Sequence, residues 1–344
     1  MKLVDTQVSG TCGSNPVEVQ VLSPAPKWNS HINHKKIIAG PTPLKRALIP
    51  DESIGFIFPP RLGDSLIGMI TVSNLLRNGF DITAYSDFIY SLRDWFPQFK
   101  INKLPPLAKI DNELAKHSTI ICMCKDYGYA EQIKKWHPHS FYLWQDPLYK
   151  APTSMVDIQL IQCREHFNLQ NITRSNGITP LPGLTYRKYK NRIMIHPTSS
   201  QKSKNWPEKK FVQLAIELTK KNYDVYFIVP ENERVEWENI VPNKKMLPKF
   251  ASLSEIASWL YESAYFIGNN SGIGHLASCL GVPTLSITAR YGDARLWRPS
   301  WGQNEIIYLP PWIISRKLKE KLWQKLISVK MVLKKFQQLQ TKSL

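Results

Sequence analysis

From Ile54 to Thr288 the chain alternates short apolar runs with longer amphipathic stretches, and this alternation limits the possible folds more than any other feature. Runs such as 54–58 have the length of buried strands, and stretches such as 65–77 carry apolar residues at helical spacing. Strands that alternate with helices of about 10–15 residues form βαβ units, whose strands lie parallel in one sheet. The sequence therefore predicts an α/β protein with parallel sheets.

The alternation falls into two sets, which residues 176–191 separate. This segment contains two glycines and two prolines followed by basic residues, a composition typical of linkers. A chain of 344 residues also favours two domains, because single cores rarely grow past about 300 residues. We therefore predict two Rossmann-like domains that face a central cleft, at residues 52–175 and 190–312. Strands are expected at 54–58, 81–85, 118–123, 141–144, 192–195, 224–229, 264–267 and 284–288, and helices at 65–77, 88–95, 112–116, 130–136, 153–169, 207–220, 231–239, 252–262 and 272–280.

Residues 1–50 differ from the rest of the chain. They contain six prolines, no sustained periodicity and few residues that could form a core, which favours a disordered extension. The segment 19–26 can also be back-translated into a sequence that resembles the T-arm and CCA end of a transfer RNA gene. A second hypothesis is therefore that translation starts downstream of Met1, which mass spectrometry of the native N-terminus would decide.

The formal net charge of +18 predicts an anionic partner, which would be nucleic acid, an anionic membrane face or a phosphorylated substrate. Nucleic acid is the weakest of these, because the sequence has no zinc-finger spacing, RNA-binding motif or basic zipper helix. No apolar stretch approaches the roughly 20 residues of a membrane-spanning helix, and the N-terminus lacks the features of a secretory signal. We therefore expect a cytoplasmic protein.

The five cysteines are odd in number and widely spread, so they predict no disulfide framework. Cys122 and Cys124 lie two residues apart in a predicted strand, without a second Cys or His pair to complete a metal site. We expect both to be buried structural thiols.

Residues 313–344 are predicted to form a basic C-terminal helix. Two interpretations of this helix are open: its apolar stripe packs on the body of the protein, which we favour, or the helix lies on an anionic membrane, where each lysine contributes about 1 kcal/mol. Both can hold together. The apolar residues at helical spacing are Leu318, Leu322, Trp323, Leu326, Ile327 and Phe336, among eight lysines and arginines between residues 316 and 335.

The first candidate site is the segment Pro60–Ser65, which directly follows a predicted strand. Ligands of parallel sheets bind beyond the carboxyl ends of the strands, so this position suits a site. Gly63 permits a tight turn, and Asp64 would be either a helix N-cap or a base that faces the cleft. Arg61 is a candidate contact for acidic groups of an acceptor, with a solvated surface position as the alternative.

Two further segments belong to the second predicted domain, and both suit an anion. His196–Pro207 contains three successive hydroxyls and two lysines, which can hydrogen-bond and neutralise diphosphate oxygens. Gly268–Ala277 runs from a strand into a helix whose free N–H groups attract phosphate, with His275 about one turn into it. A carboxylate opposite a diphosphate cradle is what inverting glycosyl transfer requires, because one removes the acceptor proton and the other stabilises the leaving group.

Taken together, the three segments resemble motifs of the heptosyltransferases of glycosyltransferase family 9, and the resemblance covers about residues 54–312. Pro60–Ser65 is similar to the glycine-aspartate motif that opens the family's sequences. His196–Pro207 is similar to the motif in which hydroxyls and a lysine precede a Trp-Pro pair. Asn270–His275 is similar to the family's most specific motif. The resemblance implies a GT-B fold, an inverting mechanism with no metal or cofactor, and transfer from ADP-heptose to a lipopolysaccharide core. The resemblance implies an enzyme that works in the cytoplasm, at the inner face of the bacterial inner membrane.

The resemblance also implies roles for individual residues. Asp64 would be the general base, with Arg61 and Gly63 beside it on the acceptor side. One departure matters, since the family usually has Asp at position 270 and Asn there loses the charge, so the sugar need not be heptose. The residues expected to bind the donor are Thr198, Ser199, Lys204, Asn270, Ser271, Gly272 and His275.

Two other functions are weighed against this one. A nucleotide-sugar-binding protein that has lost turnover has Asn270 as its only support, and the retained Asp64 argues against it. A basic nucleic-acid-binding protein is supported by charge alone.

Overall fold

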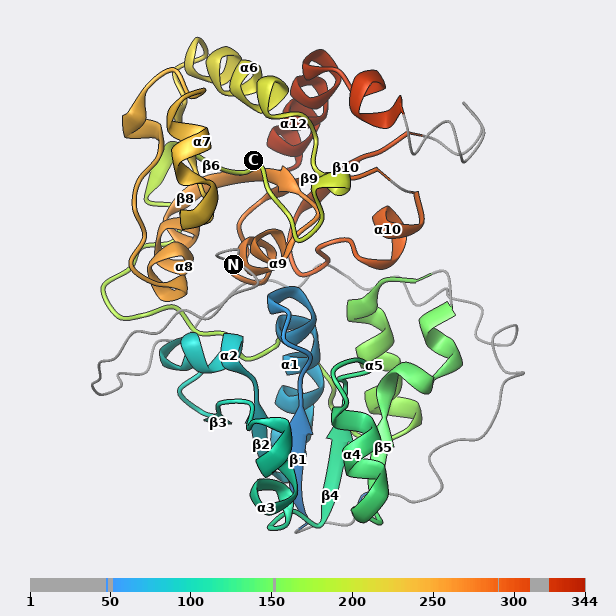
Figure 1. Cartoon of the computed structure of the whole chain (residues 1–344). Helices are drawn as coiled ribbons and strands as arrows, with labels where there is room; N and C mark the ends of the chain where they lie inside the picture. Colours follow the sequence, from blue (N-terminus) through green and yellow to red (C-terminus); the bar gives the residue numbers. More distant parts are fainter. Residues whose placement is uncertain (1–47, 49–51, 151–152, 290, 310–321, 344) are drawn as a thin grey trace.

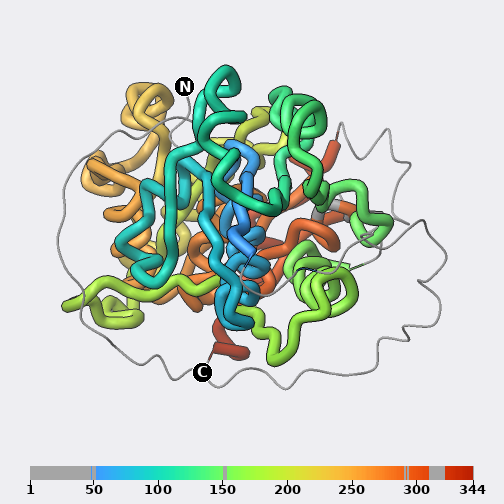
Figure 2. Tube along the Cα trace, turned by 90° about the horizontal axis from the view of Figure 1, so that it is seen from below, coloured from blue at the N-terminus to red at the C-terminus, as the bar shows by residue number. Residues whose placement is uncertain are grey.

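The computed structural model describes residues 48, 52–150, 153–289, 291–309 and 322–343. The described chain contains two five-stranded parallel sheets, with strand orders β3-β2-β1-β4-β5 and β10-β9-β8-β6-β7 (Figure 1). Seen from below in Figure 2, the first half of the chain lies over the second, so the two sheets belong to two stacked lobes. The extension expected at residues 1–50 lies, apart from Leu48, outside the described residues.

The first sheet carries helices on both of its faces. Successive residues of a strand point to opposite faces, so Phe56 packs in a cluster with Leu66 of α1, whereas Ile57 packs with Ile110 and Ile133 of α3 and α4. The strands are β1 (Ser53–Ile57), β2 (Asp81–Tyr85), β3 (Lys100–Asn102), β4 (Thr119–Cys122) and β5 (Ser140–Tyr142), and the helices are α1 (Leu62–Arg77), α2 (Asp87–Ser91), α3 (Ile110–Leu114), α4 (Tyr129–Trp136) and α5 (Met155–Glu165).

The second sheet repeats this arrangement around β8, whose residues are all buried. Ile195 and Ile267 face α6 and α12 on one side, and Phe266 faces α8 and α9 on the other. The strands are β6 (Tyr189–His196), β7 (Asp224–Phe227), β8 (Ser263–Asn269), β9 (Thr284–Ile287) and β10 (Asn304–Ile307), and the helices are α6 (Glu208–Thr219), α7 (Arg234–Glu238), α8 (Leu253–Tyr261), α9 (Gly272–Cys279), α10 (Tyr291–Leu296) and α12 (Val329–Ser343).

Both sheets reverse their strand order beside their first strand. In the first sheet β2 lies on one side of β1 and β4 on the other, and in the second sheet β7 and β8 flank β6 in the same way. Ligands of open α/β sheets bind at such reversals, beyond the carboxyl ends of the strands. The fold thus provides two adjacent crevices, one between β1 and β4 and one between β6 and β8.

A continuous apolar cluster joins the two lobes. It contains Leu66 of α1 together with Phe266 of β8 and Leu276 of α9. In Figure 1, the amino end of α1 points directly at α9 of the other lobe. The carboxyl edges of the two sheets are therefore held face to face.

The C-terminal segment packs on the second sheet, as the favoured interpretation of its sequence predicts. Trp323, Ile327 and Phe336 are buried, although Leu326 is 41% exposed. The Lys210 ammonium donates to carbonyls near the end of the short helix at 322–326. The part of the basic segment before residue 322 lies outside the described residues, which contain no helix long and apolar enough to span a membrane.

The structure differs from the predicted elements in several places. Helix α10 was not predicted, and the C-terminal helix predicted as one element is interrupted between residues 326 and 329 in the described part of the chain. The sheet edges carry β3 and β10, which were not predicted because strands of three and four residues show too little periodicity. Helix α1 begins at Leu62, so Asp64 lies in its first turn and the N-cap is Arg61, not Asp64. The second sheet begins at Tyr189, inside the predicted linker.

The two neighbouring cysteines are buried, as predicted. Cys122 and Cys124 are both fully shielded from solvent, and burial raises the pKa of the Cys124 thiol to about 12. Both thiols are therefore protonated at neutral pH and unreactive.

Candidate active site

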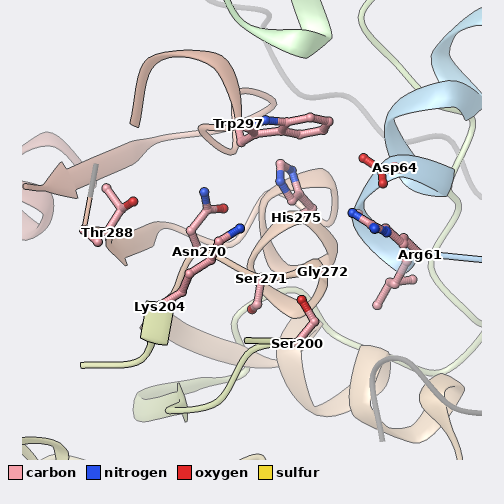
Figure 3. A pocket seen from close by; sticks show the side chains of 13 residues that line it. Arg61, Asp64, Ser200, Lys204, Asn270, Ser271, Gly272, His275, Thr288 and Trp297 are labelled. Carbon is pink, nitrogen blue, oxygen red and sulfur yellow. The ribbon is translucent and has the colours of Figure 1, made fainter. Parts of the chain in front are cut away.

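A cavity of about 220 Å³ lies where the two lobes meet (Figure 3). The first lobe contributes the start of α1, and the second contributes the loop after β6, the start of α9 and the end of β9. Both crevices at the strand-order reversals thus open into one pocket. Its lining residues are Arg61, Leu62, Gly63, Asp64, Ser200, Lys204, Asn270, Ser271, Gly272, His275, Thr288, Ala289 and Trp297.

Most of the residues singled out from the sequence meet in this pocket. Thr198 and Ser199 do not line it. Both are buried, and the Ser199 hydroxyl donates to Asn205 Oδ1 at 2.6 Å. Ser200, the next hydroxyl along the chain, lines the pocket in their place. The predicted residues that do line it are Arg61, Gly63, Asp64, Lys204, Asn270, Ser271, Gly272 and His275.

Thr288 and Trp297 are lining residues that the sequence did not reveal. Thr288 directly follows β9, so the strand-end rule applied to this strand would have found it. Trp297 follows α10 and reaches the pocket only through the tertiary fold, for which the sequence shows no signal.

The start of α9 presents unsatisfied hydrogen-bonding groups to the pocket. Ser271 is the N-cap, and its side chain makes no cap hydrogen bond. Within the described part of the chain, Ser271 Oγ and His275 Nδ1 are buried without a hydrogen-bond partner. A buried polar atom left unpaired costs about 1–3 kcal/mol, so a ligand that pairs with these atoms recovers that free energy. Together with the free backbone N–H groups of a helix start, they favour an anion.

The side chain of Asn269 fixes the loop after β6 against the end of β8. Its amide nitrogen donates to the Pro197 carbonyl at 2.6 Å, and its amide oxygen accepts from the Trp206 N–H at 3.0 Å. Asn269 is fully buried, as is Trp206. The loop that carries Ser200 and Lys204 is therefore held at both ends beside Ser271.

Two glycines let the lobes approach closely enough to share the pocket. A Cβ atom on Gly272 would lie 2.8 Å from Leu62 Cβ and 3.0 Å from the Gly63 nitrogen, and a Cβ atom on Gly63 would lie 3.0 Å from His275 Cδ2. Because α1 and α9 meet through glycine backbone, Asp64 on α1 faces the start of α9. In Figure 3 the Asp64 carboxylate lies across a gap from His275 and Asn270, and the Trp297 ring lies above His275.

His275 is 4% exposed, and burial lowers the pKa of its imidazole to about 4. The ring also packs edge-on against Trp301, with 6.0 Å between the ring centroids. At neutral pH the imidazole is uncharged, so it can orient a ligand through a hydrogen bond but contributes no positive charge.

This burial predicts a pH-dependent stability. An unfolded chain protonates His275 near pH 6.5, whereas the folded chain resists protonation down to about pH 4, so stability is lost as the pH falls through that window. When the pH is lowered from 7 to 4.5, the free energy of unfolding of wild type should fall by about 2 kcal/mol more than that of His275→Gln, as measured by urea unfolding. Equal losses in the two proteins would mean that His275 is accessible to protons in the folded state.

Two Rossmann-like lobes with their carboxyl edges facing one pocket define the GT-B class of glycosyltransferase folds. The sequence model of the family described as glycosyltransferase family 9 (heptosyltransferase) matches residues 138–320, which is more than half of the chain. The chain therefore belongs to glycosyltransferase family 9.

Solved structures of the same fold share little sequence with this chain. A family 9 glycosyl transferase from Veillonella parvula is 17% identical, with a TM-score of 0.68 over 86% of this chain and 100% of its own. Escherichia coli heptosyltransferase WaaC, solved with ADP-2-deoxy-2-fluoro heptose, is 12% identical, with a TM-score of 0.63 over 83% of this chain and 99% of its own. Escherichia coli ADP-heptose lipopolysaccharide heptosyltransferase II is 14% identical, with a TM-score of 0.62 over 84% of this chain and 99% of its own. No curated protein sequence matches the chain.

Proposed function

We propose that this protein is an inverting glycosyltransferase that moves a sugar, heptose from ADP-heptose, onto a lipopolysaccharide core-type acceptor. The observation that carries the proposal is the shared pocket, in which Asp64 of one lobe faces Lys204 and Ser271 of the other. The presence of an ADP-heptose analogue in the WaaC structure supports an ADP-sugar as the donor.

In the proposed mechanism, the Asp64 carboxylate takes the proton from an acceptor hydroxyl as that oxygen attacks the anomeric carbon of the donor sugar. The bond from this carbon to the diphosphate oxygen breaks at the opposite face, so the configuration inverts. Negative charge then grows on the departing diphosphate. The Lys204 ammonium, the Ser271 hydroxyl and the N–H groups at the start of α9 stabilise this charge, and we propose that they do so without a metal ion.

Asn270 and His275 complete the proposed donor pocket. Both line the cavity beside Ser271, and neither is charged at neutral pH, because Asn is neutral and burial lowers the pKa of His275. They can select the sugar through hydrogen bonds without opposing the positive charge of Lys204.

We further propose that the protein works in the cytoplasm and touches the inner face of the membrane through its C-terminal segment. Trp323 and Phe336 hold this segment to the second sheet, while Lys325, Lys330 and Lys334 are exposed. Exposed lysines are attracted to anionic lipid, so packing and membrane contact are compatible.

A thermal-shift panel of ADP-, UDP- and GDP-sugars tests the donor. A ligand that binds only the folded state stabilises it by about 2.7 kcal/mol at a concentration 100 times its Kd, so the ADP-sugars should raise Tm by several degrees and the others less. ADP-heptose should give the largest shift. Equal shifts for all three nucleotides, or none, would contradict the proposed donor, and binding without transfer would favour an inactive nucleotide-sugar-binding protein.

A further inference from the structure

The loop between β6 and α6, which carries Lys204 into the pocket, is held from two sides. Asn269 at the end of β8 holds one side. The other side meets residues 322–327, which precede α12 and contact the start of α6, while α12 itself lies beside α6 (Figure 1). The 322–327 segment does not line the pocket. Its contacts can therefore influence a bound ligand through the loop.

The first contact between this segment and the loop is made by Gln324. Its side-chain amide donates to the backbone carbonyl of Asn205 at 2.7 Å. Asn205 directly follows Lys204 in the chain, and its side-chain oxygen accepts from the Ser199 hydroxyl at 2.6 Å. The residue next to Lys204 is thus bonded through both its backbone and its side chain.

The second contact is made by the Ile327 carbonyl, which accepts two hydrogen bonds. The indole N–H of Trp206 donates to it at 2.9 Å, and the Lys210 ammonium donates to it at 2.8 Å. The same ammonium donates to the carbonyls of Gln324 at 2.7 Å and Lys325 at 2.9 Å. An ammonium group has three N–H bonds, so these three carbonyls use all of them. The segment is therefore fixed to the end of the loop and to the start of α6.

These contacts have a consequence for the Lys204 side chain. Trp206 and Ile327 are fully shielded from solvent, and Gln324 is half-buried, so water competes little for their hydrogen bonds. Lys204 carries its ammonium on a flexible chain of four carbons, and the position of the charge depends on where the backbone holds that chain. The bond from Gln324 to the neighbouring residue fixes this backbone.

We propose that Gln324 is a positioning residue for donor binding, because it holds the Asn205 backbone so that the Lys204 ammonium meets the diphosphate of the donor. The 322–327 segment then belongs to the donor site without touching the ligand. The inference rests on the proposed function, since it concerns the diphosphate that Lys204 is proposed to bind.

The test is a double-mutant cycle on the full-length protein, with the Kd for ADP as its readout. Gln324→Met keeps the length of the side chain and removes its N–H donor, and its effect is measured both alone and in the Lys204→Met background. Lys335→Met is the matched control. Lys335 also anchors the C-terminal region, through an ion pair with Glu305 at 2.7 Å, but it contacts the second sheet and not the loop.

Gln324→Met should raise the Kd for ADP by about 3- to 10-fold, as expected for the loss of one neutral hydrogen bond. In the Lys204→Met background the same substitution should change Kd by less than about twofold, because the group that it positions is absent. Lys335→Met should keep Kd within about twofold of wild type, even if its Tm falls as far as that of Gln324→Met. In transfer assays, Gln324→Met should raise the donor KM and leave the acceptor KM unchanged.

Three results would overturn the positioning role. An unchanged Kd in Gln324→Met would mean that the loop keeps its place without this bond. A rise by the same factor in both backgrounds would mean that Gln324 acts independently of Lys204. An equal rise in Lys335→Met would mean that a general loss of stability weakens binding.

Failure of the proposed function gives a different result. If wild type binds ADP and transfers the sugar, the function stands whatever the cycle shows. If wild type neither binds ADP nor transfers a sugar, the proposed function fails, and the positioning role fails with it.

Discussion

Asp64→Asn should lose almost all sugar transfer while the protein still folds and binds ADP. Asparagine keeps the shape of the side chain but cannot accept the proton of the attacking hydroxyl, and general base catalysis typically contributes about 10²- to 10⁴-fold. We expect kcat to fall by that factor with little change in the donor KM. Initial rates of transfer, with ADP binding followed in parallel by thermal shift, measure both quantities.

Asp111→Asn is a matched control, because Asp111 also lies in the first turn of a helix of the first lobe. An acidic residue in a first turn stabilises its helix by about 0.3–1 kcal/mol, so both variants should show a similar small loss of stability. Only Asp64→Asn should lose activity. Transfer by Asp64→Asn at the wild-type rate would remove Asp64 from the role of base.

Lys204→Met should lower kcat by about 10²- to 10³-fold, the usual effect of removing one group that stabilises charge in the transition state. Lys204 lines the pocket beside Ser271, where the departing diphosphate gains charge. Because the same ammonium meets the diphosphate of the bound donor, the Kd for ADP should also rise. Steady-state kinetics and titration with ADP separate the two effects.

Lys202→Met is the control for this variant. Lys202 belongs to the same short helical turn as Lys204, but it is exposed and does not line the pocket. It should keep activity within about twofold of wild type, as surface substitutions away from a site commonly do. Lys204→Arg should recover part of the activity, because it restores the charge with a different shape. Equal losses in Lys202→Met and Lys204→Met would indicate a diffuse electrostatic effect.

The parallel sheets could be predicted from sequence because their signal is local. Segments such as 54–58 and 264–267 are apolar throughout, as expected for strands covered on both faces. The edge strands β3 and β10 escaped prediction, since three or four residues on a sheet edge carry little pattern. The start of α1 was placed three residues late, because Leu62 and Gly63 give no cap signal.

Part of the pocket could be predicted because it, too, depends on a local signal, the residues that directly follow each strand. Asp64, Lys204 and Ser271 follow strands of parallel sheets, so the strand-end rule placed them near one another. The rule cannot say which of three successive hydroxyls faces the ligand, and the backbone path turns Ser200 to the pocket while Ser199 bonds within its loop. Trp297 reaches the pocket from a segment without a motif, and only the folded chain reveals it.

A crystal structure of the protein with ADP bound is the most direct test of this account. The diphosphate should lie at the start of α9, hydrogen-bonded to Ser271 and the neighbouring backbone N–H groups, with the Lys204 ammonium alongside and Asp64 across the gap. ADP bound outside the pocket, or a diphosphate that touches neither Lys204 nor Ser271, would contradict it.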